Sequence, residues 1–164
     1  MLSGIFQVRS GVPFTPTIGG DPLGTRGTLP FAFPDRVPGC DPVNANFKQD
    51  PRGAHYINTN CFQFPRPGYL GNSGRNSVVG PGLVNLDLSL TKNNPVMRIS
   101  ERFNIQFQAQ FFNVLNRANF APPLKAAQTN IFNQNGGPPL LGAGAITSTV
   151  TPSRQLQFAL KVVW

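Results

Sequence analysis

Three stretches of this sequence alternate strictly between apolar and polar residues, and this period of two constrains the fold more than any other feature. They cover residues 83–91, 103–111 and 155–164. On one side of these stretches all 14 positions are apolar, and on the other side 11 of 13 are polar, with Ala159 and Val163 as the exceptions. Successive side chains of a β-strand point to opposite faces, whereas an amphipathic helix needs apolar residues three and four positions apart. The pattern therefore predicts strands with one apolar and one polar face.

The connections between these strands are very unequal in length. A fourth, weaker strand is expected near residues 2–9, where Phe6 and Val8 share a face. The expected strands then lie near 2–9, 83–91, 102–112 and 154–164, separated by long loops over 10–82 and 113–153 and by a short link over 92–101 that contains a proline. Long connections on one side and short ones on the other are typical of outer-membrane barrels, whose tilted strands need roughly 9–11 residues to cross the apolar layer.

These features predict an all-β fold, namely an antiparallel transmembrane β-barrel fragment of about four C-terminal strands with long extracellular loops. In that arrangement the apolar face contacts lipid and the polar face lines the lumen. The expected lipid-facing residues are Val84, Leu86, Leu88, Leu90, Phe103, Ile105, Phe107 and Phe111. The expected lumen-facing residues are Asp87, Gln106, Gln108, Gln110, Gln155, Gln157 and Lys161. A soluble antiparallel sandwich also has alternating strands and is the alternative.

Composition narrows the classes of partner. The net charge is +8, but the basic residues are scattered singly and no nucleic-acid-binding motif accompanies them, so no nucleic-acid partner is predicted. An anionic membrane surface is an equally good electrostatic partner. No apolar stretch approaches the roughly 20 residues of a transmembrane helix, and the first residues lack the pattern of a signal peptide.

Cys40 and Cys61 both lie in the long loop 10–82, with His55 between them. Two cysteines in an exported loop form a disulfide more often than a metal site, so we expect a Cys40–Cys61 disulfide. Free thiols are the alternative if the chain is cytosolic, and one histidine with two cysteines makes a poor zinc site.

No catalytic arrangement is evident, so no enzymatic activity and no cofactor are expected. The chain has one histidine and one glutamate, and no nucleophile motif surrounds His55. The loop carboxylates lie in Pro- and Gly-rich sequence, where such residues cap turns. They are Asp21, Asp35, Asp41 and Asp50.

The final strand, residues 154–164, resembles the C-terminal targeting signal of outer-membrane barrels. That signal ends in an aromatic residue preceded by apolar residues at alternate positions. The matching residues are Leu156, Phe158, Leu160, Val162 and Trp164. The resemblance implies that the barrel-assembly machinery recognises this strand, which then pairs with the first strand to close the barrel.

Four further motifs occur in order along the chain. They are Ser10-Gly-Val-Pro-Phe14, Gly71-Asn-Ser-Gly-Arg-Asn76, Gly80-Pro-Gly82 with Asn85-Leu-Asp87, and Phe107-Gln-Ala-Gln-Phe-Phe-Asn-Val-Leu-Asn-Arg-Ala-Asn-Phe120. Together they resemble the end of the Oar-like branch of TonB-dependent outer-membrane receptors. The resemblance implies a barrel of about 22 strands with a plug in its lumen.

The sequence contains no plug, no TonB-contacting segment and no signal peptide. We therefore expect the C-terminal segment of a longer receptor in the outer membrane of a Gram-negative-type bacterium. It would supply barrel wall and extracellular ligand-access loops. The implied partners are outer-membrane lipid and lipopolysaccharide, the barrel-assembly machinery, the rest of the barrel and plug, and the TonB system. The alternatives are a porin or adhesin barrel without TonB, a secreted β-sandwich binding module, and short chains that assemble into one shared barrel.

Overall fold

The chain forms two compact units, seen in a computed structural model that describes residues 1–22, 24, 32–51, 53–98 and 103–164. The first, here called the sheet unit, comprises residues 1–10, 82–120 and 149–164. The second, here called the loop unit, comprises residues 11–81 and 121–148. Each unit is therefore assembled from segments that are far apart in the sequence.

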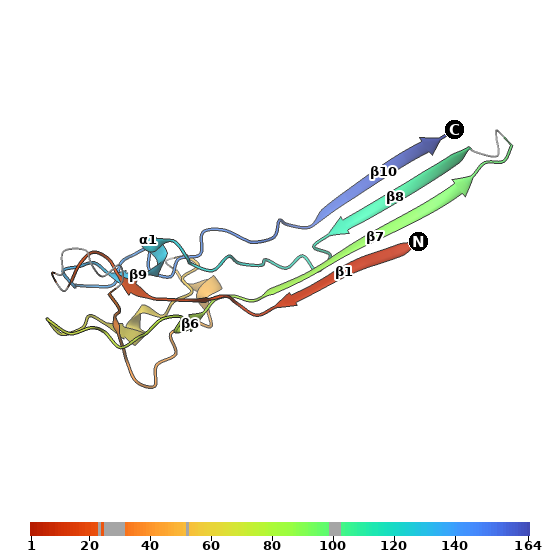
Figure 1. The fold of residues 1–164 in the computed structure, drawn as a ribbon. Helices are drawn as coiled ribbons and strands as arrows, with labels where there is room; N and C mark the ends of the chain where they lie inside the picture. Colours follow the sequence, from red (N-terminus) through yellow and green to blue (C-terminus); the bar gives the residue numbers. More distant parts are fainter. Residues whose placement is uncertain (23, 25–31, 52, 99–102) are drawn as a thin grey trace. The chain divides into compact units, whose positions relative to one another are not determined.

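The sheet unit is built on four long antiparallel strands in the order β1-β7-β8-β10 (Figure 1). They are β1 (Leu2–Arg9), β7 (Leu83–Pro95), β8 (Asn104–Phe112) and β10 (Gln155–Val163). Within this sheet the connection from β7 to β8 lies at the same end as both chain termini (Figure 1). Both long connections therefore leave from the opposite end, as the sequence predicts.

The register of the sheet places the alternating apolar residues of all four strands on one face, whereas Ile5, Phe112 and Val163 fall on the polar face. Directly paired residues of antiparallel strands lie on the same face. Leu88 pairs with Phe111, which in turn pairs with Leu156. On the other side of β7, Phe6 pairs with Leu86, so Phe6 belongs to the same face. The predicted alternation thus becomes one apolar and one polar face across the sheet.

The structure corrects four strand ends. β7 continues to Pro95, so the predicted link over 92–101 begins too early. A proline is tolerated there because Pro95 pairs at the very end of the ladder, where its missing N–H matters least. Phe103 lies just before β8, although its carbonyl oxygen accepts a 3.0 Å hydrogen bond from the Val96 nitrogen. Arg154 and Trp164 flank β10, and the part of the predicted link at 99–102 lies outside the described residues.

The extension of β7 adds two polar residues to the apolar face. Lys92 pairs with Phe107, and Asn94 pairs with Ile105. The alternation in the sequence stops at Thr91, so these positions could not be assigned to a face from the pattern alone. A lysine can lay its aliphatic stem along an apolar surface and direct its ammonium to water, which suits a place near the end of a strand.

The long loops of the prediction fold into short elements within the loop unit. Antiparallel pairs join β2 (Pro13–Phe14) to β6 (Val78–Val79) and β4 (Asp35–Arg36) to β5 (Phe62–Gln63). A parallel pair joins β3 (Thr17–Ile18) to β9 (Asn130–Phe132). Helix α1 (Ala126–Thr129) and two 3-10 turns, Phe47–Gln49 and Thr59–Cys61, complete the unit. Within the described residues, no helix has the length and apolar character needed to cross a membrane.

The loop unit has its own hydrophobic core. Its members come from segments without any regular apolar period, which is why the sequence pattern did not predict it. They are Phe14, Ile18, Ala32, Tyr56, Ile57, Cys61, Phe62, Val78, Ile131, Phe132 and Ala143. One close backbone approach requires glycine, because Gly144 has φ +74° and a Cβ there would collide with the fully buried Ile57.

Candidate functional site

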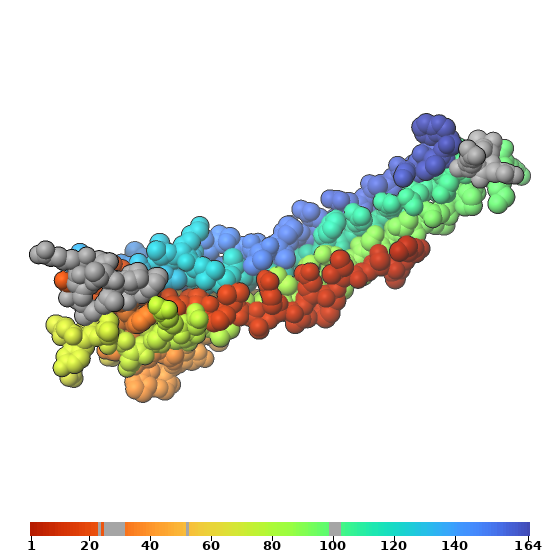
Figure 2. Space-filling model, in the orientation of Figure 1, coloured from red at the N-terminus to blue at the C-terminus, as the bar shows by residue number. Residues whose placement is uncertain are grey.

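The apolar face of the sheet is unusually exposed for large hydrophobic side chains. Phe158 is 65% exposed and Leu160 67% exposed on β10, and Phe6 is 65% exposed on β1. The space-filling view shows these two strands as the margins of the sheet, β1 in red and β10 in dark blue (Figure 2). Contiguous apolar surface of this kind marks contact with a partner or with lipid.

Aromatic rings on this face pack against each other across strands. Phe107 of β8 stacks on Phe158 of β10 with centroids 6.2 Å apart, and Phe111 meets the same ring edge-on at 6.4 Å. Such cross-strand pairs stabilise a sheet and fix its register. They leave the outer side of the rings available to an apolar environment.

The polar face carries a row of side-chain amides. The Gln108 Nε2 atom donates to Gln106 Oε1 at 3.0 Å, and Gln106 Nε2 donates to Asn93 Oδ1 at 2.8 Å. On the neighbouring strand, Gln157 pairs with Gln110 and Lys161 pairs with Gln106 in the ladder. The predicted lumen-facing residues of β8 and β10 therefore do share one face.

Two buried amide oxygens of this polar face have no hydrogen-bond partner among the described residues. They are Asn85 Oδ1 on β7 and Asn104 Oδ1 on β8. Asn85 is 7% exposed and borders a cavity of about 300 Å³ that is also lined by Asp87, Gln155 and Gln157. Both oxygens are enclosed by atoms of the chain itself, so they are exceptions to the pairing that buried acceptors nearly always show.

Two asparagines, Asn113 and Asn119, join the segments of the sheet unit at the end where the long connections leave. Asn113 follows β8 in the left-handed conformation, with φ 49°, and its nitrogen donates to Asp87 Oδ1 at 2.8 Å. Its side-chain amine donates to the carbonyl oxygens of Arg117 and Pro152, both at 3.0 Å. Asn113 therefore holds together the ends of β7, β8 and the segment that leads into β10.

Asn119, six residues further along the chain, also joins separate segments through its side chain. Its side chain, 1% exposed, accepts from the Val84 nitrogen at 3.0 Å and donates to Thr151 Oγ1 at 2.9 Å. Both asparagines belong to the motif over residues 107–120, for which sequence analysis had no physical role. A signal was present for Asn113, since an asparagine directly after a strand favours a left-handed turn, but not for Asn119, which lies seven residues beyond the end of β8.

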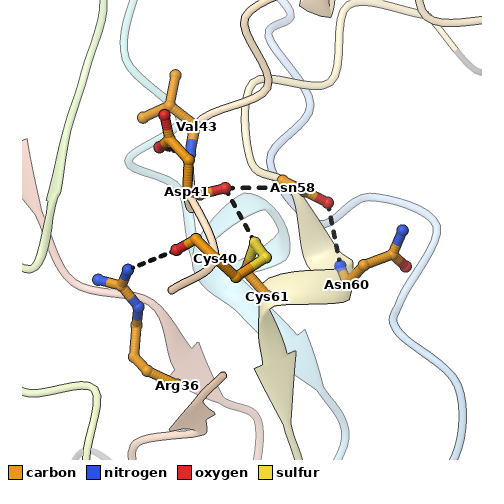
Figure 3. Close-up of a disulfide and its surroundings, with 7 residues drawn as sticks. All are labelled: Arg36, Cys40, Asp41, Val43, Asn58, Asn60 and Cys61. Atoms are coloured by element: carbon orange, nitrogen blue, oxygen red, sulfur yellow. Dashed lines mark hydrogen bonds between the residues drawn. A yellow bond between two sulfur atoms is a disulfide. The ribbon is translucent and has the colours of Figure 1, made fainter. Parts of the chain in front are cut away.

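Cys40 and Cys61 form the predicted disulfide, with Cα atoms 5.3 Å apart (Figure 3). Cys61 is fully buried in the core of the loop unit. Arg36 Nη2 donates to the Cys40 carbonyl oxygen at 3.0 Å, which ties the bridge to β4. The Cys61 sulfur lies 2.9 Å from the Asp41 carbonyl oxygen, a close contact only, because a disulfide sulfur carries no proton.

Two of the loop carboxylates, Asp41 and Asp35, cap backbone nitrogens, as predicted for turn-capping residues. Asp41 Oδ1 accepts from the Val43 nitrogen at 2.9 Å, and Asp35 Oδ1 accepts from the Asn72 nitrogen at 3.0 Å. Asp50 accepts from the Asn44 amine at 3.2 Å, and the Asp21 carbonyl oxygen accepts from the Gly24 nitrogen at 3.2 Å.

The buried His55 ring faces two backbone carbonyl oxygens. Its Nδ1 lies 3.1 Å from Gly53 O, and its Nε2 lies 2.8 Å from Leu141 O. Across the described part of the chain, no three histidine, cysteine, aspartate or glutamate residues gather as metal ligands would. The geometry gives His55 a structural role in the loop unit.

One tyrosine in the loop unit has a shifted titration. Tyr56 is buried, and its hydroxyl donates to the Val79 carbonyl oxygen at 2.8 Å. Burial, with a smaller contribution from the Asp41 carboxylate, raises the pKa of Tyr56 above its ordinary value of 10.0.

A long antiparallel sheet with one apolar and one polar face, short connections at one end and long folded connections at the other, defines the wall of a membrane β-barrel. The chain belongs to the outer membrane beta barrel domain family, whose model matches residues 1–157. No curated protein and no solved structure matches it. The predicted fold class is thus confirmed, and the family places the protein in the outer membrane.

Proposed function

We propose that this chain is the C-terminal barrel segment of an Oar-like TonB-dependent receptor in the outer membrane of a Gram-negative-type bacterium. Its apolar face contacts lipid and its polar face lines the lumen. The loop unit lies outside the cell and shapes ligand access. The proposed role is non-catalytic and involves no nucleic acid.

The observation that carries the proposal is the row of side-chain amides along the polar face. A receptor of this class holds a folded plug inside the barrel, and the plug offers backbone and side-chain groups to the wall. Gln106, Gln108 and Gln157 lie on this face together with Lys161. A plug against this face would give these side chains polar partners.

The ends of the sheet support the orientation. Outer-membrane barrels have short periplasmic turns and long extracellular loops. The short β7–β8 connection lies at the end of both termini, so that end belongs in the periplasm (Figure 1). The loop unit then faces the exterior, where a disulfide such as Cys40–Cys61 is stable.

The sheet edges indicate the remaining partners. β1 and β10 are the outer strands of the four-stranded sheet, and open edges are not tolerated in lipid. The rest of the barrel therefore pairs with them, and the barrel-assembly machinery recognises β10 together with Trp164. Membrane lipid covers the apolar face, and lipopolysaccharide surrounds the extracellular rim.

The test uses the full-length product of the gene that encodes this chain. The reading frame upstream of the Met1 codon is expected to encode a signal peptide, a TonB-contacting segment and a plug. A stop codon immediately upstream, with its own ribosome-binding site, would refute the TonB-dependent receptor.

A matched pair of cross-linking variants tests the plug directly. A photo-reactive amino acid at Gln108, on the polar face, should form a cross-link within the polypeptide to a plug peptide, identified by mass spectrometry. The same residue at Phe107, its neighbour on the apolar face, should capture lipid instead. A porin, whose lumen holds water, predicts no internal cross-link from Gln108, and that result would favour the alternative.

A further inference from the structure

The loop unit contains a cavity of about 600 Å³, the size of the sites that bind small organic molecules. Its walls come from several residues between Pro13 and Gly20, from Phe33, from Arg75 and Asn76, and from Leu124, Ala126, Thr129 and Asn130. All of these belong to the loop unit. Tertiary folding therefore assembles one concave surface from segments that lie far apart in the sequence.

The Gly71–Asn76 motif forms the turn that presents Arg75 to this cavity. Gly74, with φ 70°, and Asn76, with φ 53°, are both in the left-handed conformation, so the backbone reverses on either side of Arg75. The Asn76 nitrogen donates to Thr15 Oγ1 at 2.9 Å, which ties the turn to the opposite wall.

Further hydrogen bonds, made by Asn72 and Ser73, hold the beginning of the same turn. Asn72 Oδ1 accepts from the Arg36 nitrogen at 2.7 Å, and the Asn72 nitrogen donates to Asp35 Oδ1 at 3.0 Å. The Ser73 nitrogen also donates to the Pro34 carbonyl oxygen at 3.0 Å. The backbone of the turn is thus held on both sides of Arg75, whose side chain is exposed, so less backbone entropy is lost when a ligand binds.

The part of the lining formed by β3, β9 and Leu124 combines neutral polar groups with apolar surface. Thr17 Oγ1 donates to Asn130 Oδ1 at 2.6 Å, and this bond joins β3 to β9. Because the amide oxygen is engaged by Thr17, the Asn130 side chain has its amine available as a donor. Ile18 and Leu124 add apolar surface to the same lining, and Leu124 is 54% exposed.

The charge of the cavity selects the kind of ligand. Among the described lining residues, Arg75 is the one that carries a charge, and none is acidic. A guanidinium binds a carboxylate through two parallel hydrogen bonds, and such charge-assisted pairs are stronger than neutral ones. Arg75 is exposed to water, so a neutral ligand would gain nothing from its charge.

We propose that this cavity binds a small organic carboxylate. Its carboxylate pairs with Arg75, its hydroxyl or amide groups bond to Thr129 and Asn130, and its apolar part packs on Ile18 and Leu124. The inference deepens the proposed receptor function and depends on it only for the outward position of the loop unit.

Binding is measured by ligand-observed NMR and calorimetry on the full-length protein in detergent. The probes are 4-hydroxybenzoate and galacturonate, with 4-hydroxybenzamide and galactose as their neutral counterparts. At least one carboxylate should bind saturably, and its neutral counterpart should bind at least about tenfold more weakly. The absence of saturable binding by both carboxylates at millimolar concentration would overturn the proposal.

Two substitutions localise the binding. Arg75→Gln should weaken the carboxylate by about tenfold or more, whereas Arg66→Gln, which removes the same charge from an exposed position of the loop unit outside the cavity lining, should leave binding unchanged. An equal loss in both variants would place the anion elsewhere and refute the site. Protease resistance of the disulfide-linked unit verifies that Arg75→Gln is folded.

The outcome is separable from that of the receptor proposal. Carboxylate binding without a plug upstream would leave the site valid in another kind of barrel. A plug with TonB contacts but no binding would leave the receptor valid and remove this ligand class.

Discussion

The Asn113 nitrogen donates a 2.8 Å hydrogen bond to the Asp87 carboxylate, which joins the residue just after β8 to the polar face of β7. The same asparagine fixes Arg117 and Pro152 through its side chain. One residue therefore links β7, the segment after β8 and the segment before β10 at the end of the sheet where the long connections leave. A defect there should loosen the strand ends first.

Substitution of Asn113 separates its backbone role from its side-chain role. Asn113→Gly keeps the left-handed backbone at little cost but loses the side-chain bonds, which should lower the free energy of unfolding by about 1–3 kcal/mol. Asn113→Ala adds about 1–2 kcal/mol of left-handed strain. The thermal midpoint of the heat-modifiable band on gels should fall in the order wild type, glycine, alanine. Equal midpoints for all three would show that the network is dispensable.

Removal of the disulfide should destabilise the loop unit while the sheet stays assembled. The bridge closes a loop between positions 21 apart in sequence, so the double variant Cys40→Ser/Cys61→Ser should lose about 3 kcal/mol. We expect faster protease cleavage in residues 11–81 and an unchanged heat-modifiable barrel. Reduction of the wild type should reproduce the effect, and the double variant itself should be insensitive to reductant. Unchanged cleavage rates in both cases would contradict the prediction.

A charge on the apolar face should be far more costly than one on the polar face. Phe107→Lys introduces an ammonium on the apolar face directly opposite Lys92, and it should cost about 1–3 kcal/mol, between the values for the membrane midplane and the interface. Gln108→Lys, on the adjacent residue of β8, adds the same charge to the polar face and should cost much less. Phe107→Ala removes the ring, with its stacking on Phe158 and its lipid contact, without adding a charge. Urea unfolding in lipid vesicles gives the comparison, and equal costs at 107 and 108 would argue against lipid contact.

The raised pKa of Tyr56 predicts a loss of stability at high pH. Its phenol is neutral in both states below pH 10.0, so its contribution is fully present there. As the pH rises past 10.0, the unfolded state ionises first, and stability falls until the pH passes the pKa of the folded state. Tyr56→Phe should remove this part of the alkaline slope and also lose the bond to Val79, worth about 1 kcal/mol. Protease resistance of the loop unit measured against pH tests both effects, and an identical slope in the variant would refute the first.

Local periodicity was enough to predict the strands of the sheet. The alternation from Leu83 to Thr91 assigned side chains to faces, because a strand has a period of two whatever lies beside it. The pairing of Leu88 with Phe111 and of Phe111 with Leu156 brings like faces together, although the alternation did not specify this particular register. The alternation could not show that β7 continues through Lys92 to Pro95, since the extra residues place polar side chains on the apolar face.

The fold of the loop unit could not be predicted from local periodicity. Its core joins Phe14, Ile57 and Ile131, which have no common period and meet only after long-range closure of the chain. The sequence alone determined the two-faced strands, the disulfide partners and the membrane class, because each depends on residue type and short spacing. Only the tertiary structure decided that the long connections fold, that Asn113 and Asn119 close the strand ends, and that Arg75 borders a cavity, because these depend on contacts between segments whose proximity no local pattern encodes.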